Sequence, residues 1–279
     1  MITDFSAMSG GTFLLYYGAL VIGAVMAGLW LPAFLRPDGR HQQVSDQGQL
    51  AWLASGPGRF TEATLARLFG RGLLEADAGN KLRVSRAGAG DSEPERLLTA
   101  GGGVFGITEA HRMLKPYAAR VEDELIERDL VMDRGARWQL RLAGAAPYLA
   151  VLAVGWYRRQ AGEALGEPTG FLTALMVVAA LLMFWRLVRL DPRTRAGQAA
   201  LGEAKIKAAR LRSAATGPEL GIGVALFGTA ILAGTPYSQL HAMRTAATGD
   251  GAGGYAGDGG DSGGDGGSGC GGGCGGCGG

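Results

Sequence analysis

The sequence predicts a mainly α-helical integral membrane protein: three or four spans, a small cytoplasmic α+β region that is winged-helix-like, and a disordered C-terminal tail. Three observations support this class: long uncharged apolar runs, arginines gathered beside the ends of those runs, and a terminal segment of almost pure glycine. Apolar runs of this length are typical of membrane helices, which satisfy their own backbone polar groups. The charge balance, 27 Lys and Arg against 25 Asp and Glu, provides no overall field for nucleic acid.

The first run, residues 12–35, contains no charged residue. As a helix it would be about 36 Å long, more than the hydrocarbon core of about 30 Å. A signal peptide is the alternative interpretation, but it needs a basic segment before a shorter apolar core. The only charge before this run is Asp4, so we interpret the run as a transmembrane helix.

Two further runs, residues 142–157 and 168–185, are separated by ten residues and predict a helical hairpin in the membrane. Trp156, Tyr157 and Trp185 stand at the edges of these runs, as interfacial aromatic anchors do. The fourth run, residues 220–237, is diluted by Gly and Thr. It either spans the membrane or lies at its surface.

Arginines predict the orientation of these spans in a multi-pass protein of the cell membrane. Cytoplasmic loops carry an excess of Lys and Arg near the membrane. Arginines of this kind flank residues 36–141 and the basic segment 186–219, which are therefore expected inside, with the N-terminus outside: Arg36, Arg40, Arg134, Arg137, Arg141, Arg186, Arg189, Arg193 and Arg195. Arg158 and Arg159 are the exceptions. The side of the tail depends on whether the fourth run spans.

The region 36–141 is long enough for one small core and has the order helix, turn, helix, short strand. The "GPG" at 56–58 is expected to break the first helix, Thr61 to cap the next, and Gly72 to end it. The "LRV" at 82–84 is similar to a wing strand, and "VEDELIERDLV" later in the chain aligns loosely as a second such unit. Helices rich in Glu do not suit a DNA groove, so a docking domain is expected and no nucleic acid.

The candidate chemistry lies in the tail, residues 249–279, where Cys270, Cys274 and Cys277 have the spacing C-x3-C-x2-C in glycine. Thiolates bind soft metals, so zinc or copper is the candidate ligand, although a structural zinc site usually has four ligands. The alternatives are a thiol-redox site, or a glycine tract that tolerates cysteine. The tail has no aliphatic side chain larger than Ala and is expected to be disordered. His41, His111 and His241 show no metal-ligand spacing, and no catalytic motif is recognised, so the chain is expected not to be an enzyme or to hold another cofactor.

The lipid bilayer is the first expected partner. Small residues recur every four positions in two runs and allow close helix contacts and homo- or hetero-oligomers. They are Ala19, Gly23 and Ala27 in the first run and Gly221, Ala225, Thr229 and Ala233 in the fourth. The basic stretch from Arg193 to Arg212 either lies on anionic lipid or forms a solvated helix.

The order of these parts, with "DPRTRAG" at 191–197 as the most specific segment, resembles a family of uncharacterised bacterial membrane proteins common in actinobacteria. The resemblance covers about residues 12–240 and implies a membrane topology with a variable low-complexity C-terminus. It implies no activity, cofactor or catalytic residue. The sequence therefore predicts a non-enzymatic docking or scaffold protein of the membrane, with a metal or thiol-redox sensor as the alternative.

Overall fold

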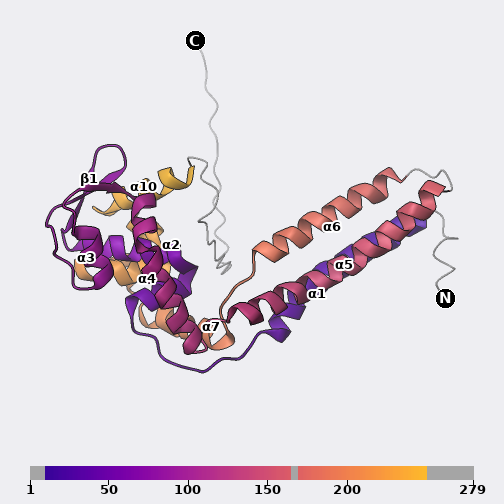
Figure 1. Cartoon of the computed structure of the whole chain (residues 1–279), viewed down its shortest axis with the longest axis horizontal. Helices are drawn as coiled ribbons and strands as arrows, with labels where there is room; N and C mark the ends of the chain where they lie inside the picture. Colours follow the sequence, from indigo (N-terminus) through magenta and orange to yellow (C-terminus); the bar gives the residue numbers. More distant parts are fainter. Residues whose placement is uncertain (1–9, 165–168, 250–279) are drawn as a thin grey trace, which may run out of the picture.

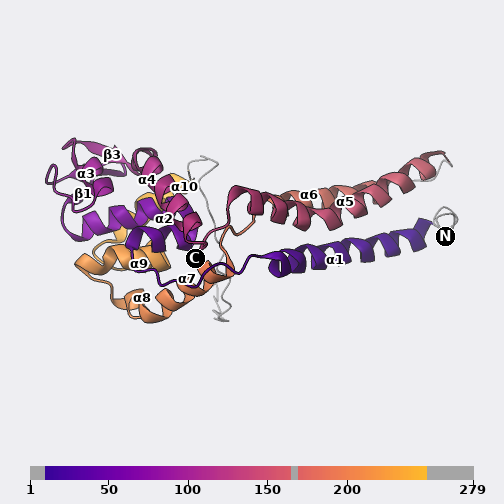
Figure 2. The same ribbon diagram turned by 60° about the horizontal axis from the view of Figure 1, so that its bottom comes forward.

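Three long helices lie side by side and end at a domain formed by the other elements, as the computed structural model shows for residues 10–164 and 169–249 (Figures 1 and 2). The long helices are α1 (Gly10–Leu35), α5 (Arg134–Ala164) and α6 (Gly170–Val188). Each is long and apolar enough to cross a membrane. The three spans predicted first are therefore confirmed as helices of that length and composition. Helix α5 extends the predicted 142–157 at both ends and is about 46 Å long.

The three long helices alternate in direction: α1 runs toward the domain, α5 away from it and α6 back (Figure 1). Helix α5 packs on both α1 and α6. Small residues allow close contact, because a Cβ atom on Gly155 would lie 2.5 Å from the Tyr17 hydroxyl oxygen. That hydroxyl donates a hydrogen bond to the carbonyl of Val151 across 3.2 Å. The outward faces keep large apolar side chains exposed, including Ile22, Val177 and Phe184.

The domain begins with α2 (Gln47–Gly70), which bends where Ser55 and Gly56 leave helical geometry. Gly56 has φ +71°, which residues other than glycine rarely adopt, so the predicted break at 56–58 is confirmed. The predicted cap at Thr61 is wrong. Asp46 caps α2, and Thr61 lies within the helix, where its hydroxyl donates to the carbonyl of Pro57. Gly72, with φ +68°, follows the end of the helix as expected.

A three-stranded antiparallel sheet follows α2, in the order β1-β2-β3. Its strands are β1 (Leu74–Asp77), β2 (Lys81–Val84) and β3 (Val104–Gly106), with α3 (Glu93–Thr99) between β2 and β3 and α4 (Ile107–Glu127) after β3. The predicted strand at 82–84 is confirmed. The winged-helix resemblance is not confirmed, because the third strand lies between α3 and α4, and α4 is one continuous helix. In the expected second helix–strand unit, the helix is part of α4, and the strand is reduced to a single bridge between Val131 and Arg193.

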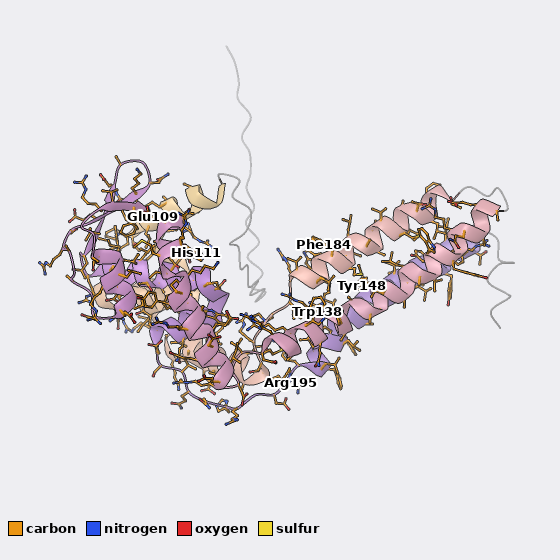
Figure 3. The ribbon with its side chains drawn as sticks, in the orientation of Figure 1. Glu109, His111, Trp138, Tyr148, Phe184 and Arg195 are labelled. Carbon is orange, nitrogen blue, oxygen red and sulfur yellow. The ribbon has the colours of Figure 1, made fainter. Side chains whose placement is uncertain are left out.

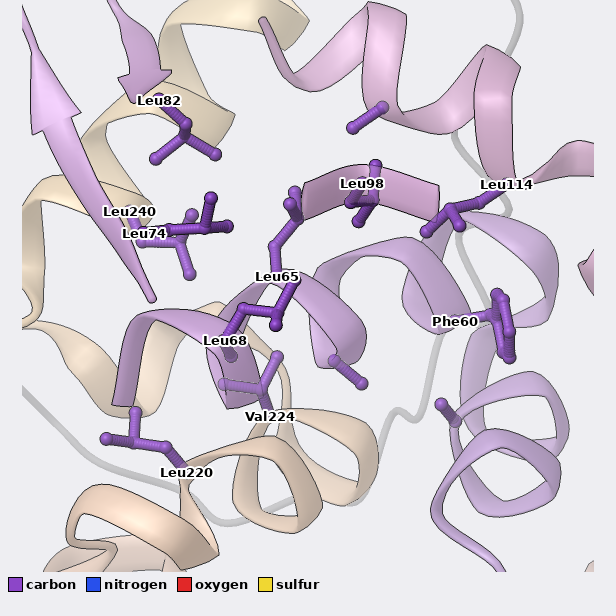
Figure 4. Close-up of a cluster of buried hydrophobic side chains, with 14 of the residues drawn as sticks. Phe60, Leu65, Leu68, Leu74, Leu82, Leu98, Leu114, Leu220, Val224 and Leu240 are labelled. Carbon is purple, nitrogen blue, oxygen red and sulfur yellow. The ribbon is translucent and has the colours of Figure 1, made fainter. Parts of the chain in front are cut away.

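The fourth apolar run, residues 220–237, belongs to this domain and does not form a long helix. It forms α9 (Leu220–Phe227), a bend at Gly228 with φ +86°, and the 3₁₀ turn η2 (Thr229–Leu232). Eight helical residues extend about 12 Å and cannot cross a bilayer. Leu220 and Val224 are instead buried beside Leu68 of α2 in the main hydrophobic core (Figure 4). The span, one of the two alternatives predicted for this run, is therefore wrong. An apolar run suits a protein core as well as it suits lipid.

The domain thus combines two chain segments that the α5–α6 hairpin separates. Residues up to about 133 supply one half. The other half comes from the C-terminal elements, so the predicted domain 36–141 contains only part of the core. The predicted basic segment 186–219 belongs to the same unit except for residues 186–188, which end α6. These elements are α7 (Arg195–Lys207), α8 (Leu211–Ala214), the 3₁₀ turn η1 (Gly217–Glu219), α9, η2 and α10 (Ser238–Gly249). The second predicted stripe of small residues is also part of this unit, since Gly221 contacts α2 and not lipid.

Candidate functional site at the junction of the long helices and the domain

The segment Asp191–Gly197, "DPRTRAG", lies where α1, α6 and the domain meet. Asp191 organises its first half. The Asp191 carboxylate accepts hydrogen bonds from the Arg193 backbone at 3.0 Å, the Arg193 side chain at 2.9 Å, Gln198 at 2.8 Å and Arg36 at 3.1 Å. Burial alone would raise the pKa of Asp191, but the charge and hydrogen bonds of Arg193, with the Gln198 bond, lower it overall. The carboxylate is therefore ionised and ties the end of α1 to the segment that enters α7.

Arg195 joins the same segment to the end of α1. Its backbone N–H donates to the carbonyl of Pro37. Its guanidinium donates to the carbonyls of Ala33 and Phe34 at 3.1 and 3.3 Å and to Asp38 at 2.8 Å. The last carbonyls of a helix lack intrahelical partners and carry partial negative charge, so a cation there stabilises the helix end. Arg195 lies at this end of the long helices in Figure 3.

Thr194 joins the segment to the loop between α4 and α5. Its hydroxyl oxygen caps α7 by accepting from the N–H of Gly197, and the hydroxyl donates to the carbonyl of Asp129 at 2.8 Å. The N–H of Thr194 donates to Leu130. A Cβ atom on Gly197 would overlap the Leu130 carbonyl, so the backbones touch only because this residue is glycine. We call this set of contacts of residues 191–197 the joint.

Two arginines face the helix bundle beside the joint. Arg186 of α6 donates from Nε to the carbonyl of Gly28 in α1 at 2.9 Å. Its Cγ and Nε atoms each lie 3.9 Å from where a Cβ atom on Gly144 of α5 would be. One turn earlier on α5, the Nε atom of Arg141 is buried without a hydrogen-bond partner among the described residues. Tyr148, two turns after Arg141 on α5, packs its ring against Gly28 of α1.

Exposed tryptophans mark this end of the bundle. Trp138 of α5 and Trp185 of α6 are more than half exposed, and Trp30 of α1 is exposed near Gly28. At the far end, Trp156 and Tyr157 are exposed in the same way. Trp138 and Trp156 are separated by about 27 Å along α5, close to the thickness of a hydrocarbon core. The two sets thus have the spacing of interfacial aromatic belts.

A groove of about 510 Å³ opens on the domain between α2, the start of α3 and α4. Its carboxylates outnumber its cations. Glu95 is buried and paired with Arg67 and Arg71, and Glu93 is paired with Arg120 at 3.4 Å. Asp46 and Glu124 are the lining carboxylates without an ion pair among the described residues. The residues that line the groove and carry charge are Asp46, Arg67, Glu93, Glu95, Arg120 and Glu124. Tyr117 donates to Glu93, and Gln49 donates to Glu124.

The predicted metal ligands Cys270, Cys274 and Cys277 lie outside the described residues. Within residues 10–164 and 169–249, no three His, Cys, Asp or Glu side chains converge as metal ligands. The histidines are dispersed: His41 pairs with Glu203, His111 with Thr61 and His241 with Thr229. Burial, and then the charge of Lys115, lower the pKa of His111. Figure 3 shows His111 in the domain, far from Trp138 on α5.

The basic stretch divides between two roles. Arg193 and Arg195 belong to the joint, whereas Arg210 forms a two-pronged ion pair with Glu219 at 2.7 and 3.1 Å. In the sequence, Arg141 and Arg186 indicate only the orientation of the spans. Glycines at 28 and 144, at the level where these arginines face inward, are the signal that could have indicated their contact.

No family model, no curated protein and no solved structure matches this chain. The resemblance to the actinobacterial membrane family therefore stays a prediction.

Proposed function

We propose that the chain is a non-enzymatic docking protein of the cell membrane, with α1, α5 and α6 as its spans and the domain as a platform fixed at the cytoplasmic surface. The observation that carries this proposal is the joint. Its hydrogen bonds connect α1, the segment between α6 and α7, and the loop before α5. A domain held at three points keeps a fixed orientation relative to the spans, which suits presentation of a surface to partners.

The charge distribution supports the orientation. Arginines gather where the long helices meet the domain, and the positive-inside rule assigns that side to the cytoplasm. Because the run 220–237 packs in the domain, the tail that follows α10 begins on the same side. Washing membranes with alkaline carbonate tests the first step: the protein should remain in the pellet, and its release would contradict the proposed spans.

The groove between α2, α3 and α4 is the docking surface that we propose. Its excess of carboxylates fits a basic segment of a partner protein. A photoreactive amino acid at position 120, on the groove rim, should give a discrete protein adduct in intact cells. The same residue at position 206, exposed on α7 outside the groove, is the control.

Charge reversal at Glu124, Glu124→Lys, should remove the position-120 adduct, because it repels a basic segment. Equal adduct patterns at positions 120 and 206, or a pattern that the charge reversal leaves intact, would contradict docking in the groove.

The alternative function, a metal or thiol sensor, is favoured by the C-x3-C-x2-C spacing of Cys270, Cys274 and Cys277. On the cytoplasmic side these thiols would stay reduced and available to zinc or copper. The purified full chain should then bind metal, and a variant with all three cysteines changed to serine should not. Equal metal content in both proteins would exclude the sensor.

A further inference from the structure

We propose that Arg141 and Arg186 bind the phosphate group of an anionic phospholipid at the domain-side end of the spans. The inference rests on the proposed membrane location of α1, α5 and α6. It goes beyond docking, since it assigns a specific ligand to side chains that face the bundle.

The first observation is the state of Arg141. Within the described residues its guanidinium forms no hydrogen bond and no ion pair, and its Nε atom is shielded from solvent. An arginine has five N–H donors that favour planar, two-pronged contacts with carboxylate or phosphate oxygens. A guanidinium whose Nε atom is shielded and has no internal acceptor therefore points to an acceptor that the chain itself does not supply.

The second observation concerns Arg186, which lies near Arg141 at the same end of the bundle. Arg186 lies against Gly144, one helical turn after Arg141 on α5. Among the described residues, its hydrogen-bond acceptors are the backbone carbonyls of Gly28 and Arg189, and none is a carboxylate. Asp191, the acidic group of the joint, is already shared by Arg36, Arg193 and Gln198. Two arginines about one helical turn apart at this level of the bundle thus lack a carboxylate partner within the described residues.

The third observation is depth. Arg141 lies three residues, about 4.5 Å along α5, from the exposed Trp138, and Arg186 directly follows the exposed Trp185. Tryptophans at the ends of spans mark the headgroup level of a bilayer. The phosphates of phospholipids lie at that level, and those of anionic lipids also leave a net negative charge to balance the two cations.

The test uses the full chain in nanodiscs of phosphatidylcholine, with or without phosphatidylglycerol. Phosphatidylglycerol should raise the Tm of the wild-type protein in a saturable way, and native mass spectrometry should detect retained lipid. Arg141→Gln should retain phosphatidylglycerol about tenfold less, as expected for loss of one charge-assisted contact. Because Arg141 makes no hydrogen bond within the described residues, this variant loses no internal hydrogen bond and should fold.

The matched control is Arg134→Gln. Arg134 is an exposed arginine at the start of the same helix, also without an ion pair among the described residues, and it should behave as wild type. Arg186→Gln should weaken lipid retention too, while also lowering the Tm in phosphatidylcholine because the Gly28 contact is lost.

Three results would overturn the proposal. Equal retention by Arg141→Gln and wild type would remove the site, and an equal loss in Arg134→Gln would reduce it to general surface charge. Inorganic phosphate that reproduces the full Tm increase in phosphatidylcholine discs would assign the site to a soluble phosphate compound. If the proposed membrane location is wrong, the protein will be soluble without detergent, and that result is distinct from loss of the lipid site.

Discussion

Replacing Leu220 by alanine tests whether the run 220–237 forms part of a protein core. Leu220 is 1% exposed and packs beside Leu68 in the two-segment core. The substitution removes three carbon groups, worth about 2.4 kcal/mol at about 0.8 kcal/mol each. A residual cavity adds to this, since Gly70 and Gly217 hold the adjacent backbones in contact and limit collapse. We expect a loss of about 3 kcal/mol, or about 150-fold in the unfolding equilibrium.

Pulse proteolysis of the full chain in nanodiscs, over a urea series, would measure the free energy of unfolding of the domain. Ile206→Ala is the control, because Ile206 is exposed on α7 and should change this free energy by less than about 0.5 kcal/mol. A side chain facing lipid would behave like the control, since acyl chains fill the space that the leucine leaves. A change below about 0.5 kcal/mol for Leu220→Ala would therefore refute the core assignment.

Three further changes test the joint, the bundle and the domain. Asp191→Asn should cost about 2 kcal/mol of domain stability, measured by urea unfolding, because it weakens charge-assisted bonds that join α1 to α7. Because the pKa of Asp191 is lowered in the folded protein, its contribution to stability is present above the unfolded pKa of about 3.9 and is lost as pH falls through the folded value. An acid-unfolding transition that is unchanged in Asp191→Asn would contradict this contribution. Gly28→Ala should lower thermal stability in detergent by about 1–3 kcal/mol, because the new Cβ would lie 2.7 Å from the Tyr148 ring, whereas Gly23→Ala, with no atom within 4 Å, should not. The lowered pKa of His111 means that stability falls as pH drops below the unfolded value of about 6.5; this slope should disappear in His111→Gln, and its persistence would exclude the histidine.

The sequence was sufficient for the three long helices because length and lack of charge are local properties. It was not sufficient for residues 220–237, whose composition suits lipid and a core equally. What distinguishes them is the contact of Leu220 and Val224 with α2, about 150 residues earlier in the chain. The position of Gly228 was visible, but its φ of +86°, which stops α9, was not.

The joint was recognised from the sequence only as a specific string. Within "DPRTRAG", the local part could have been inferred: Thr194 has the residue type of a helix cap, and Asp191 precedes a proline. The role of the string depends on partners elsewhere, namely the carbonyls of Ala33 and Phe34 and those of Asp129 and Leu130. No pattern of spacing within seven residues contains that information.

The way the chain passes through the domain explains why the joint is needed. The α5–α6 hairpin leaves the domain after Val131 and returns before Arg193, and these two residues form a backbone bridge. The hairpin is thus an insertion whose two ends are held together at one place, while α1 enters beside them through Arg36 and Asp191. Since α9 supplies the main packing surface of α2, the domain core requires the two ends of the hairpin to lie together. If α1, α5 and α6 span the membrane as proposed, an insertion that left α6 on the wrong side would separate α9 from α2. Formation of the core and the topology of these helices would then depend on each other.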